Sequence, residues 1–169
     1  LTDYYAPAPV CSPSRAGLLT GRYPVRTRVT QVPMTEGGTL GAPLARVPLY
    51  EIQRAFGAAT RLPLEEITLS EVLQAAGYAT GMFGKWHLGG QSPSLPNERG
   101  FDRFEGLLSS NDQVPNPYFR GSEVVEQTPV DQSTLTERYT DAAISFIDQN
   151  RAKPFFIYIP HTFPHRPLH

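Results

Sequence analysis

Cys11 and Arg15 are the residues whose types and spacing best suit chemistry in this chain. A thiol is a potential nucleophile, and a guanidinium binds oxyanions through a fork of N–H donors. The surrounding residues predict a helix over about 13–20, which leaves Cys11 just outside its N-terminus, where unpaired backbone N–H groups face a ligand. Arg15 lies one turn along and can direct its guanidinium to the same point. Such an arrangement suits a tetrahedral oxyanion.

Two other interpretations of this pair have to be weighed. A Cys-x-x-x-Arg pattern by itself is more often a buried free thiol beside a surface arginine, because free cysteine is among the most buried residue types. A tyrosine-phosphatase loop needs a longer spacing between cysteine and arginine. The residue at that longer spacing is Gly17, so that class is excluded.

The whole run from Cys11 to Arg22 resembles the signature of the type I sulfatases, and in particular of arylsulfatase A-like enzymes. The matching residues are Cys11, Pro13, Ser14, Arg15, Leu19, Thr20, Gly21 and Arg22. In that family a maturation enzyme oxidises the cysteine to formylglycine, and the hydrated aldehyde is the nucleophile. The resemblance therefore implies a formylglycine at Cys11, a formylglycine-generating maturation enzyme as a partner, and the hydrolysis of sulfuric esters.

Lys85 and His87 form a second candidate group, directly after a predicted strand. In an extended chain they point to the same side, with Trp86 on the other. By themselves, a surface lysine and a histidine with its hydrogen bonds satisfied are the more common interpretation. However, the segment 77–89 resembles the second sulfatase signature. In that signature the lysine contacts sulfate and the histidine contacts the formylglycine.

Ser110 lies in a segment, 101–113, that is similar to an arylsulfatase segment ending in a sulfate-contacting serine. A serine hydroxyl can donate a hydrogen bond to a sulfate oxygen without adding charge. The alternative is a turn-capping serine, since asparagine and aspartate follow it.

Three histidines follow the last predicted strand, at positions 161, 165 and 169. Their spacing of four would suit a zinc site on a helix, but prolines at 160, 164 and 167 exclude a helix. In the family's strand-then-Pro-His-x-Pro segment, a histidine contacts the substrate ester and can protonate the leaving oxygen. His165 matches it by position, and His161 is the second choice.

The resemblance implies a mechanism in two steps. One hydroxyl of the hydrated aldehyde at Cys11 attacks sulfur, and the alcohol leaves with a proton from His165. The second hydroxyl, deprotonated by His87, then expels sulfate, whereas a plain serine would stop at a stable sulfate ester. Lys85, Ser110 and a divalent cation would offset the oxyanion charge. Arg15 would assist them.

The calcium ion implied by the family lacks its ligands here. Calcium requires hard oxygen donors. The family's carboxylate pairs have no counterpart, because Asp3 stands singly and Asp112 and Asp141 lie in other contexts. Cys11, as formylglycine, is the one expected metal ligand, and the carboxylates are expected outside this chain. The hypothesis is a segment that is inactive alone, within a longer calcium-dependent sulfatase.

Composition and charge exclude several other classes of protein. The 169 residues suffice for one domain with a core, and a net charge of −1 gives no nucleic-acid footprint. No apolar run is long enough for a membrane span. Disulfides within the chain are excluded by its single cysteine. The resemblance implies a periplasmic, secreted or lysosomal enzyme.

The helices and strands that we expect to position these residues indicate an α/β fold. Capping boxes begin helices over 69–76 and about 135–150, while Ser12 and Gly21 delimit the first helix. Buried strands over 78–83 and 154–159 follow the two later helices. The other expectations are an edge strand at 101–104, a hairpin strand at 123–127, and a loop over 24–62 with a possible helical turn at 50–56. We expect a mainly parallel, mixed central sheet flanked by helices, of alkaline-phosphatase type by resemblance. Residues 1–169 would form one partial catalytic domain that lacks the first strand and the C-terminal part.

Two competing functions stay open at this stage. A phosphodiester or phosphonate monoester hydrolase of the same superfamily would share the fold and the formylglycine. A non-catalytic module derived from a sulfatase would share the fold alone. The substrate is also open, because a small aryl sulfate, a sulfated glycan and a sulfolipid all fit the resemblance.

Overall fold

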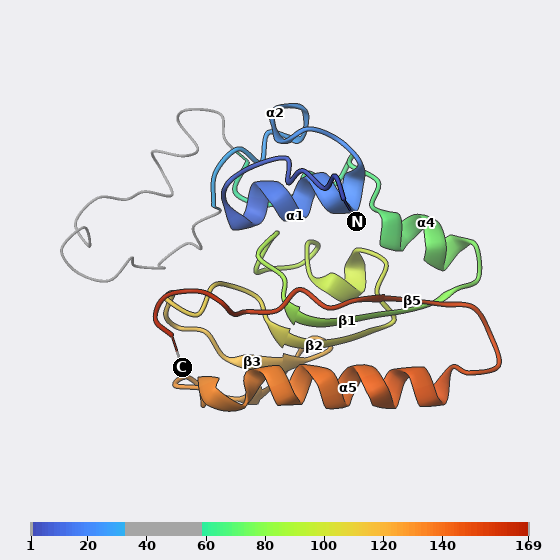
Figure 1. Cartoon of the computed structure of the whole chain (residues 1–169), viewed down its shortest axis with the longest axis vertical. Helices are drawn as coiled ribbons and strands as arrows, with labels where there is room; N and C mark the ends of the chain where they lie inside the picture. The colour runs from blue at the N-terminus through green and yellow to red at the C-terminus, as the bar shows by residue number, and fades with distance from the viewer. Residues whose placement is uncertain (1, 33–58, 169) are drawn as a thin grey trace.

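The computed structural model describes residues 2–32 and 59–168, which form an α/β sandwich. Helix α1 (Cys11–Thr20) and the short helix α2 (Pro24–Thr27) lie on one side of the sheet, and α5 (Leu135–Gln149) lies on the other (Figure 1). The helical turn expected at 50–56 and His169 fall outside the described residues. Within the described part, no helix combines the length and apolarity needed to cross a membrane.

The sheet of the described residues has five strands in the order β4-β3-β2-β1-β5. Their bounds are β1 Ala79–Lys85, β2 Arg103–Leu107, β3 Tyr118–Arg120, β4 Glu123–Glu126 and β5 Phe155–Tyr158. Strand β1 pairs in parallel with β2 and β5, whereas β3 pairs antiparallel with both β2 and β4. The expected mixed sheet is confirmed. The edge strand expected at 101–104 is wrong, because β2 lies between β1 and β3 and the hairpin β3–β4 covers its outer side.

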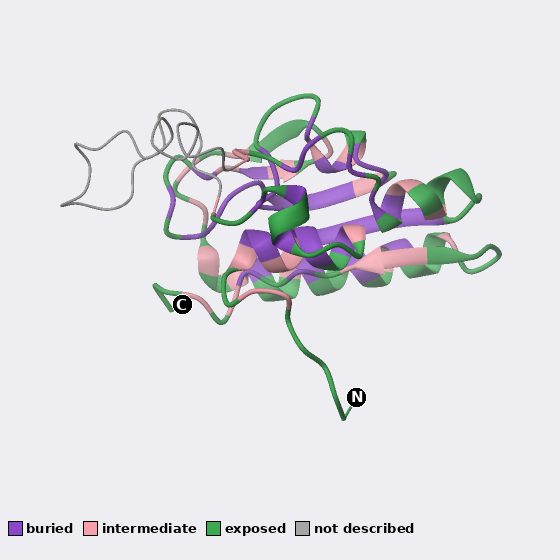
Figure 2. Ribbon diagram, turned by 90° about the horizontal axis from the view of Figure 1, so that it is seen from above, coloured by how far each residue is buried: buried purple, intermediate pink, exposed green. Residues whose placement is uncertain are grey.

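Two apolar cores fill the two sides of the sheet. Successive side chains of β1 alternate between them, with Met82 facing α1 and Phe83 facing α5. Every residue of β1 is buried, and Figure 2 shows the central strands as the most enclosed part of the molecule. A strand buried on both faces favours apolar or small residues, and β1 has them at every position except Thr80 and its last residue, Lys85.

The helix ends agree in part with the sequence. Helix α4 (Leu69–Ala75) begins with the expected capping box of Thr68 and Glu71. Helix α1 begins earlier than predicted, because Val10 is the N-cap and its carbonyl oxygen accepts from Ser14 N. Cys11 is therefore the first helical residue rather than a residue outside the helix. The predicted end of helix α1 at Gly21, which has φ 66°, is confirmed.

The capping box expected at residues 134–137 is wrong. A short 3₁₀ turn, η2 (Gln132–Thr134), leads directly into α5. Asp131 caps this turn, since its carboxylate accepts from Ser133 N, and the Thr134 hydroxyl donates to the Asp131 carbonyl. The Thr134 side chain is therefore engaged behind the helix and does not cap it. A second 3₁₀ turn, η1 (Pro96–Glu98), precedes β2.

Glu71 makes the stability of this fold sensitive to acid. Burial raises the pKa of Glu71, but hydrogen bonds from Arg99 and Thr68 outweigh that effect and hold it below its ordinary 4.5. The ionised carboxylate therefore stabilises the fold above about pH 4.5, and this contribution is lost as the pH falls through the lowered pKa. We expect Glu71→Gln to lower the free energy of unfolding by roughly 1–2 kcal/mol at neutral pH. The loss should shrink in acid.

Thermal melting from neutral pH to about pH 3 measures this difference. Glu65→Gln is the matched control, because Glu65 pairs with Arg28 on the surface, where both side chains are more than half exposed. Its melting curve should follow that of the wild type at every pH. Equal melting temperatures for Glu71→Gln and the wild type at neutral pH would contradict the prediction.

Candidate active site

The carboxyl ends of β1, β2 and β5 converge because two glycines let their backbones touch. Gly84 and Gly106 are opposite each other in the parallel β1–β2 pair. A Cβ atom on Gly106 would overlap the carbonyl oxygen of Gly84, and one on Gly84 would overlap that of Pro160. Backbone hydrogen bonds continue the contact beyond the strands, from Lys85 N to Pro160 O at 2.8 Å and from His87 N to Leu108 O at 3.0 Å. The three following loops are therefore held side by side.

We expect Gly106→Ala to destabilise the fold by about 3 kcal/mol or more. The residue has φ 154°, and its new methyl group would meet the backbone of Gly84, which cannot move without disturbing β1. Chemical denaturation measures the loss. Gly121→Ala is the matched control, because Gly121 also has a positive φ, 62°, but its added Cβ meets nothing closer than 3.9 Å. That control should lose only about 1–2 kcal/mol, and equal losses in the two variants would refute the backbone clash.

Cys11 and His87 are brought together from the two sides of this junction. Cys11 is the first residue of α1, and its Sγ lies 3.3 Å from Nδ1 of His87. His87 is 97% buried on the loop after β1 and has φ 58°, an unusual conformation for a residue with a side chain. Sulfur and imidazole are close enough for direct proton transfer.

Lys85, Ser110 and His165 form a second, connected chain of hydrogen bonds. Lys85 Nζ donates to Ser110 Oγ at 2.8 Å, and Ser110 Oγ lies 3.4 Å from His165 Nε2. Nδ1 of His165 lies 2.7 Å from the carbonyl oxygen of Arg166, which can only accept, so Nδ1 carries the proton and Nε2 accepts from Ser110. Lys85 and Ser110 are both almost fully buried. The serine thus links a buried cation to a histidine at the rim of the site.

Arg15 contacts the strand ends rather than the cysteine. Its NH1 donates to the carbonyl oxygen of Lys85 at 2.5 Å, and its NH2 donates to that of His161 at 3.5 Å. The guanidinium therefore joins the ends of β1 and β5 while its charge stays close enough to act on Lys85 and His87. The ring of His161 packs 6.3 Å from that of Tyr139, so His165, not His161, is the histidine beside Ser110.

Burial and positive charge set the protonation states of the site. Burial lowers the pKa of His87 well below 6.5, the charges of Lys85 and Arg15 lower it further, and the Gln113 side chain opposes the shift. His87 is therefore neutral near pH 6.5 and able to accept a proton. Burial also lowers the pKa of Lys85 from 10.5, and the nearby Cys11 opposes this shift. A buried cation beside a neutral base suits an anionic ligand.

Sequence reasoning brought six residues to this site, and the structure places all six around one junction: Cys11, Arg15, Lys85, His87, Ser110 and His165. Their catalytic roles stay predictions. Residues that it missed support the loop of Ser110. Gln113 accepts from Ser110 N at 3.2 Å, and Asn111 donates to the carbonyl oxygen of Pro167 at 3.0 Å. Both lie within three residues after Ser110, so their place in the sequence was the available signal.

The described residues alone do not suit a calcium ion. Calcium takes six to eight oxygen ligands, with several carboxylates among them. Around Cys11 the structure instead gathers two cations and an imidazole. Among residues 2–32 and 59–168, no group of three or more His, Cys, Asp or Glu side chains is placed to hold a metal.

The chain matches the family model described as Sulfatase over residues 1–169. It is 35% identical to arylsulfatase G of Canis lupus familiaris over 98% of the chain and 34% of that protein. It is 36% identical to N-acetylgalactosamine-6-sulfatase of Sus scrofa over 99% of the chain and 33% of that protein. The chain thus spans about a third of the length of these curated relatives.

Solved structures show the same fold. The structure of Ps i-CgsB in complex with k-i-k-neocarrahexaose superimposes with a TM-score of 0.71 at 27% identity, covering 98% of this chain and 37% of that one. The PsFucS1 sulfatase from Pseudoalteromonas sp. gives a TM-score of 0.66 at 25% identity over 94% of this chain and 35% of that one.

Proposed function

The chain belongs to the sulfatase family, and from this premise we propose that it carries the nucleophile and sulfate-binding groups of a sulfuric ester hydrolase. The family resemblance inferred from the sequence motifs is thereby confirmed. The single observation that carries the proposed activity is the convergence of Cys11, His87 and Lys85 at the joined ends of β1 and β2. A nucleophile, a neutral base and a buried cation are the groups that sulfuryl transfer needs.

We propose that Cys11 acts after oxidation to formylglycine. The hydrated aldehyde would supply the attacking hydroxyl and a second hydroxyl for release of sulfate. The site suits this group, because His87 Nδ1 lies 3.3 Å from Sγ of Cys11, the atom whose place an oxygen would take. His87, kept neutral by burial, accepts the proton of the second hydroxyl, which then expels sulfate.

Lys85 and Ser110 act on the sulfuryl oxygens. Lys85 supplies a positive charge where negative charge develops, and burial strengthens its effect. Ser110 donates a hydrogen bond once its hydroxyl turns from His165 toward the ester. His165 is then free at Nε2, at the half-exposed rim, where Nε2 would take up a proton from solvent and pass it to the leaving alcohol. Arg15 holds the ends of β1 and β5 together through two carbonyl oxygens, and its positive charge acts on Lys85 and His87.

A sulfated sugar is the proposed substrate class. The relative from Sus scrofa is named N-acetylgalactosamine-6-sulfatase, and the Ps i-CgsB structure is a complex with k-i-k-neocarrahexaose. A small aryl sulfate is the second candidate, on the strength of the arylsulfatase relatives. A phosphodiester or phosphonate monoester hydrolase would use the same groups. Comparing the rates of sulfate-ester and phosphate-ester hydrolysis distinguishes it from a sulfatase.

The rest of the enzyme belongs to the proposal as well. Because the chain spans about a third of its relatives, we propose that it works within a longer protein. That protein would supply the carboxylates of a calcium ion to which the formylglycine at Cys11 is also a ligand. A maturation enzyme is the expected partner, and a periplasmic, secreted or lysosomal location stays a prediction.

Mass spectrometry of the Cys11 peptide, followed by rate assays, tests this proposal. The full-length enzyme, co-expressed with a maturation enzyme, should carry an aldehyde in place of the thiol. It should hydrolyse an aryl sulfate and a sulfated sugar faster than the matching phosphate esters. A persistent thiol would support the non-catalytic module instead, and faster phosphate-ester hydrolysis would support the phosphodiesterase.

A further inference from the structure

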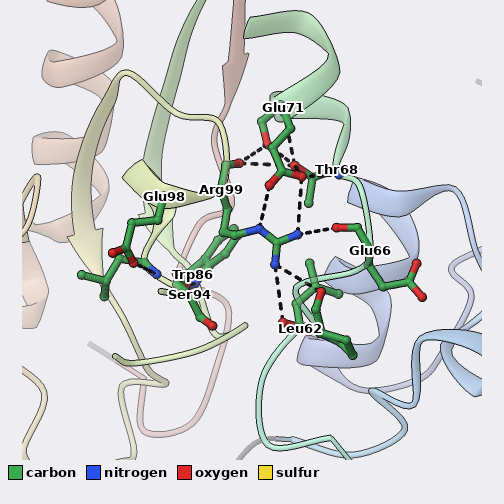
Figure 3. Close-up of polar contacts among 11 residues, drawn as sticks. Leu62, Glu66, Thr68, Glu71, Trp86, Ser94, Glu98 and Arg99 are labelled. Carbon is green, nitrogen blue, oxygen red and sulfur yellow. Dashed lines mark hydrogen bonds and ion pairs between the residues drawn. The ribbon is translucent and has the colours of Figure 1, made fainter. Parts of the chain in front are cut away.

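Arg99 is a buried arginine outside the group of reacting residues. Its side chain donates hydrogen bonds to several carbonyl oxygens of one backbone segment (Figure 3). Its guanidinium is 2% exposed and donates to the carbonyl oxygens of Leu62, Pro63 and Glu66. Its Nε also donates to the Glu71 carboxylate at 2.9 Å. A planar fork with five donors can hold several acceptors at once, which a lysine cannot do. Residues 62–66 are therefore fixed by one side chain.

The segment 62–66 is in turn bonded to the loop that carries His87. Leu62 N donates to the carbonyl oxygen of Leu88 at 2.8 Å, and both residues are fully buried. Leu88 directly follows His87, whose backbone has the unusual φ of 58°. Such a conformation persists only where the surroundings hold it. The hydrogen bond from Leu62 is one of the contacts that do so.

The same segment is bonded to the helix that carries Cys11. The Glu66 carboxylate is 7% exposed and pairs with Arg22 at 3.0 Å, just beyond the end of α1. Glu66 therefore joins helix α1 through its side chain and Arg99 through its carbonyl oxygen. Segment 62–66 thus lies between the two parts of the chain that bring Cys11 and His87 together.

We propose that Arg99 is a positioning residue for the proposed sulfatase reaction. By fixing segment 62–66, it sets the distance between α1 and the loop after β1, and so between Cys11 and His87. The inference rests on the proposed function, since His87 must act as the base for this distance to matter. Arg99 itself touches none of the reacting groups.

A double-mutant cycle in the full-length, formylglycine-containing enzyme tests this role, with an aryl sulfate as substrate. Arg99→Lys keeps the charge near Glu71 but loses the fork. We expect it to lower kcat about tenfold while KM changes less than about twofold. In the His87→Ala background, the same substitution should lower kcat less than about twofold, because the group that it positions is gone.

Arg138→Lys is the matched control for loss of stability alone. Arg138 pairs with Glu126 at 2.7 Å, is partly buried with 29% of its side chain exposed, and lies over the Tyr118 ring on the far side of the sheet. It should lower the melting temperature and leave kcat within about twofold. Arg22→Gln is a second probe if Arg99→Lys folds poorly, because it loosens segment 62–66 from a half-exposed ion pair. We expect it to lower kcat about threefold, again only while His87 is present.

The outcomes separate the two proposals. Equal fold losses of kcat with and without His87, for Arg99→Lys and Arg22→Gln alike, would overturn the positioning role and leave the sulfatase proposal intact. An unchanged kcat in both variants would do the same. If the wild-type enzyme hydrolyses no sulfate ester, or if His87→Ala matches its rate, the proposed function is wrong and the role of Arg99 falls with it.

Discussion

Cys11→Ser, made without a serine-oxidising maturation enzyme, is expected to stop the reaction after a single turnover. A serine hydroxyl can take the sulfuryl group, but it has no second hydroxyl on the same carbon to expel sulfate. Steady-state kcat should therefore fall by on the order of 10⁴-fold or more, as for the loss of a nucleophile elsewhere. Intact-mass analysis after incubation with an aryl sulfate should show one sulfuryl group retained per chain.

Cys11→Ala is the control for this experiment. It should lose the same steady-state activity and retain no sulfuryl group, because no hydroxyl remains at position 11. Both variants should keep the melting temperature close to that of the wild type, since the side chain is small and half-buried. Full turnover by Cys11→Ser would show that the nucleophile lies elsewhere.

Lys85→Met should give the second largest effect, with activity and stability moving in opposite directions. Lys85 is 1% exposed, and its Nζ donates to Ser110 Oγ at 2.8 Å. Losing a charge aimed at the transition state costs roughly 10²–10³-fold in kcat. Methionine is of similar length and avoids the burial of a charge, so the free energy of unfolding should stay equal or rise.

Ser110→Ala provides the matched comparison, because it removes a neutral donor from the same hydrogen-bonded chain. Its kcat should fall only about tenfold. Steady-state kinetics and chemical denaturation of both variants make the measurement. A Lys85→Met variant as active as the wild type would contradict a sulfate-binding role for the ammonium group.

The main elements of the fold could be predicted because their sequence signals are local. The capping box at Thr68 and the run of buried residues in β1 need no knowledge of the rest of the chain. The central place of β2 in the sheet could not be predicted, because it depends on which strands pair with it. The start of α1 was misplaced for a similar reason. Ser12 has the residue type of an N-cap, but it is fully buried, and the extended backbone of Val10 ends the preceding segment instead.

The candidate site could be predicted to the extent that its groups lie in motifs. Cys11, Lys85 and His165 each follow a recognisable pattern, and the parallel strand ends bring them to one place. The arrangement of Arg15 could not be predicted, because backbone carbonyls as acceptors leave no mark on the sequence. The same holds for Arg99, whose partners are mostly main-chain oxygens far away in the chain.

The left-handed backbone of His87 bears on how such a protein could decay into a non-catalytic one. Glycine and asparagine adopt this conformation more readily than histidine. Once selection for turnover is relaxed, replacement of the imidazole by either residue would relieve backbone strain, and random mutation would be free to remove the base first. A glycine or asparagine at the equivalent of position 87, beside an intact Cys11 segment, would thus be an early mark of a lost activity among descendants of this chain.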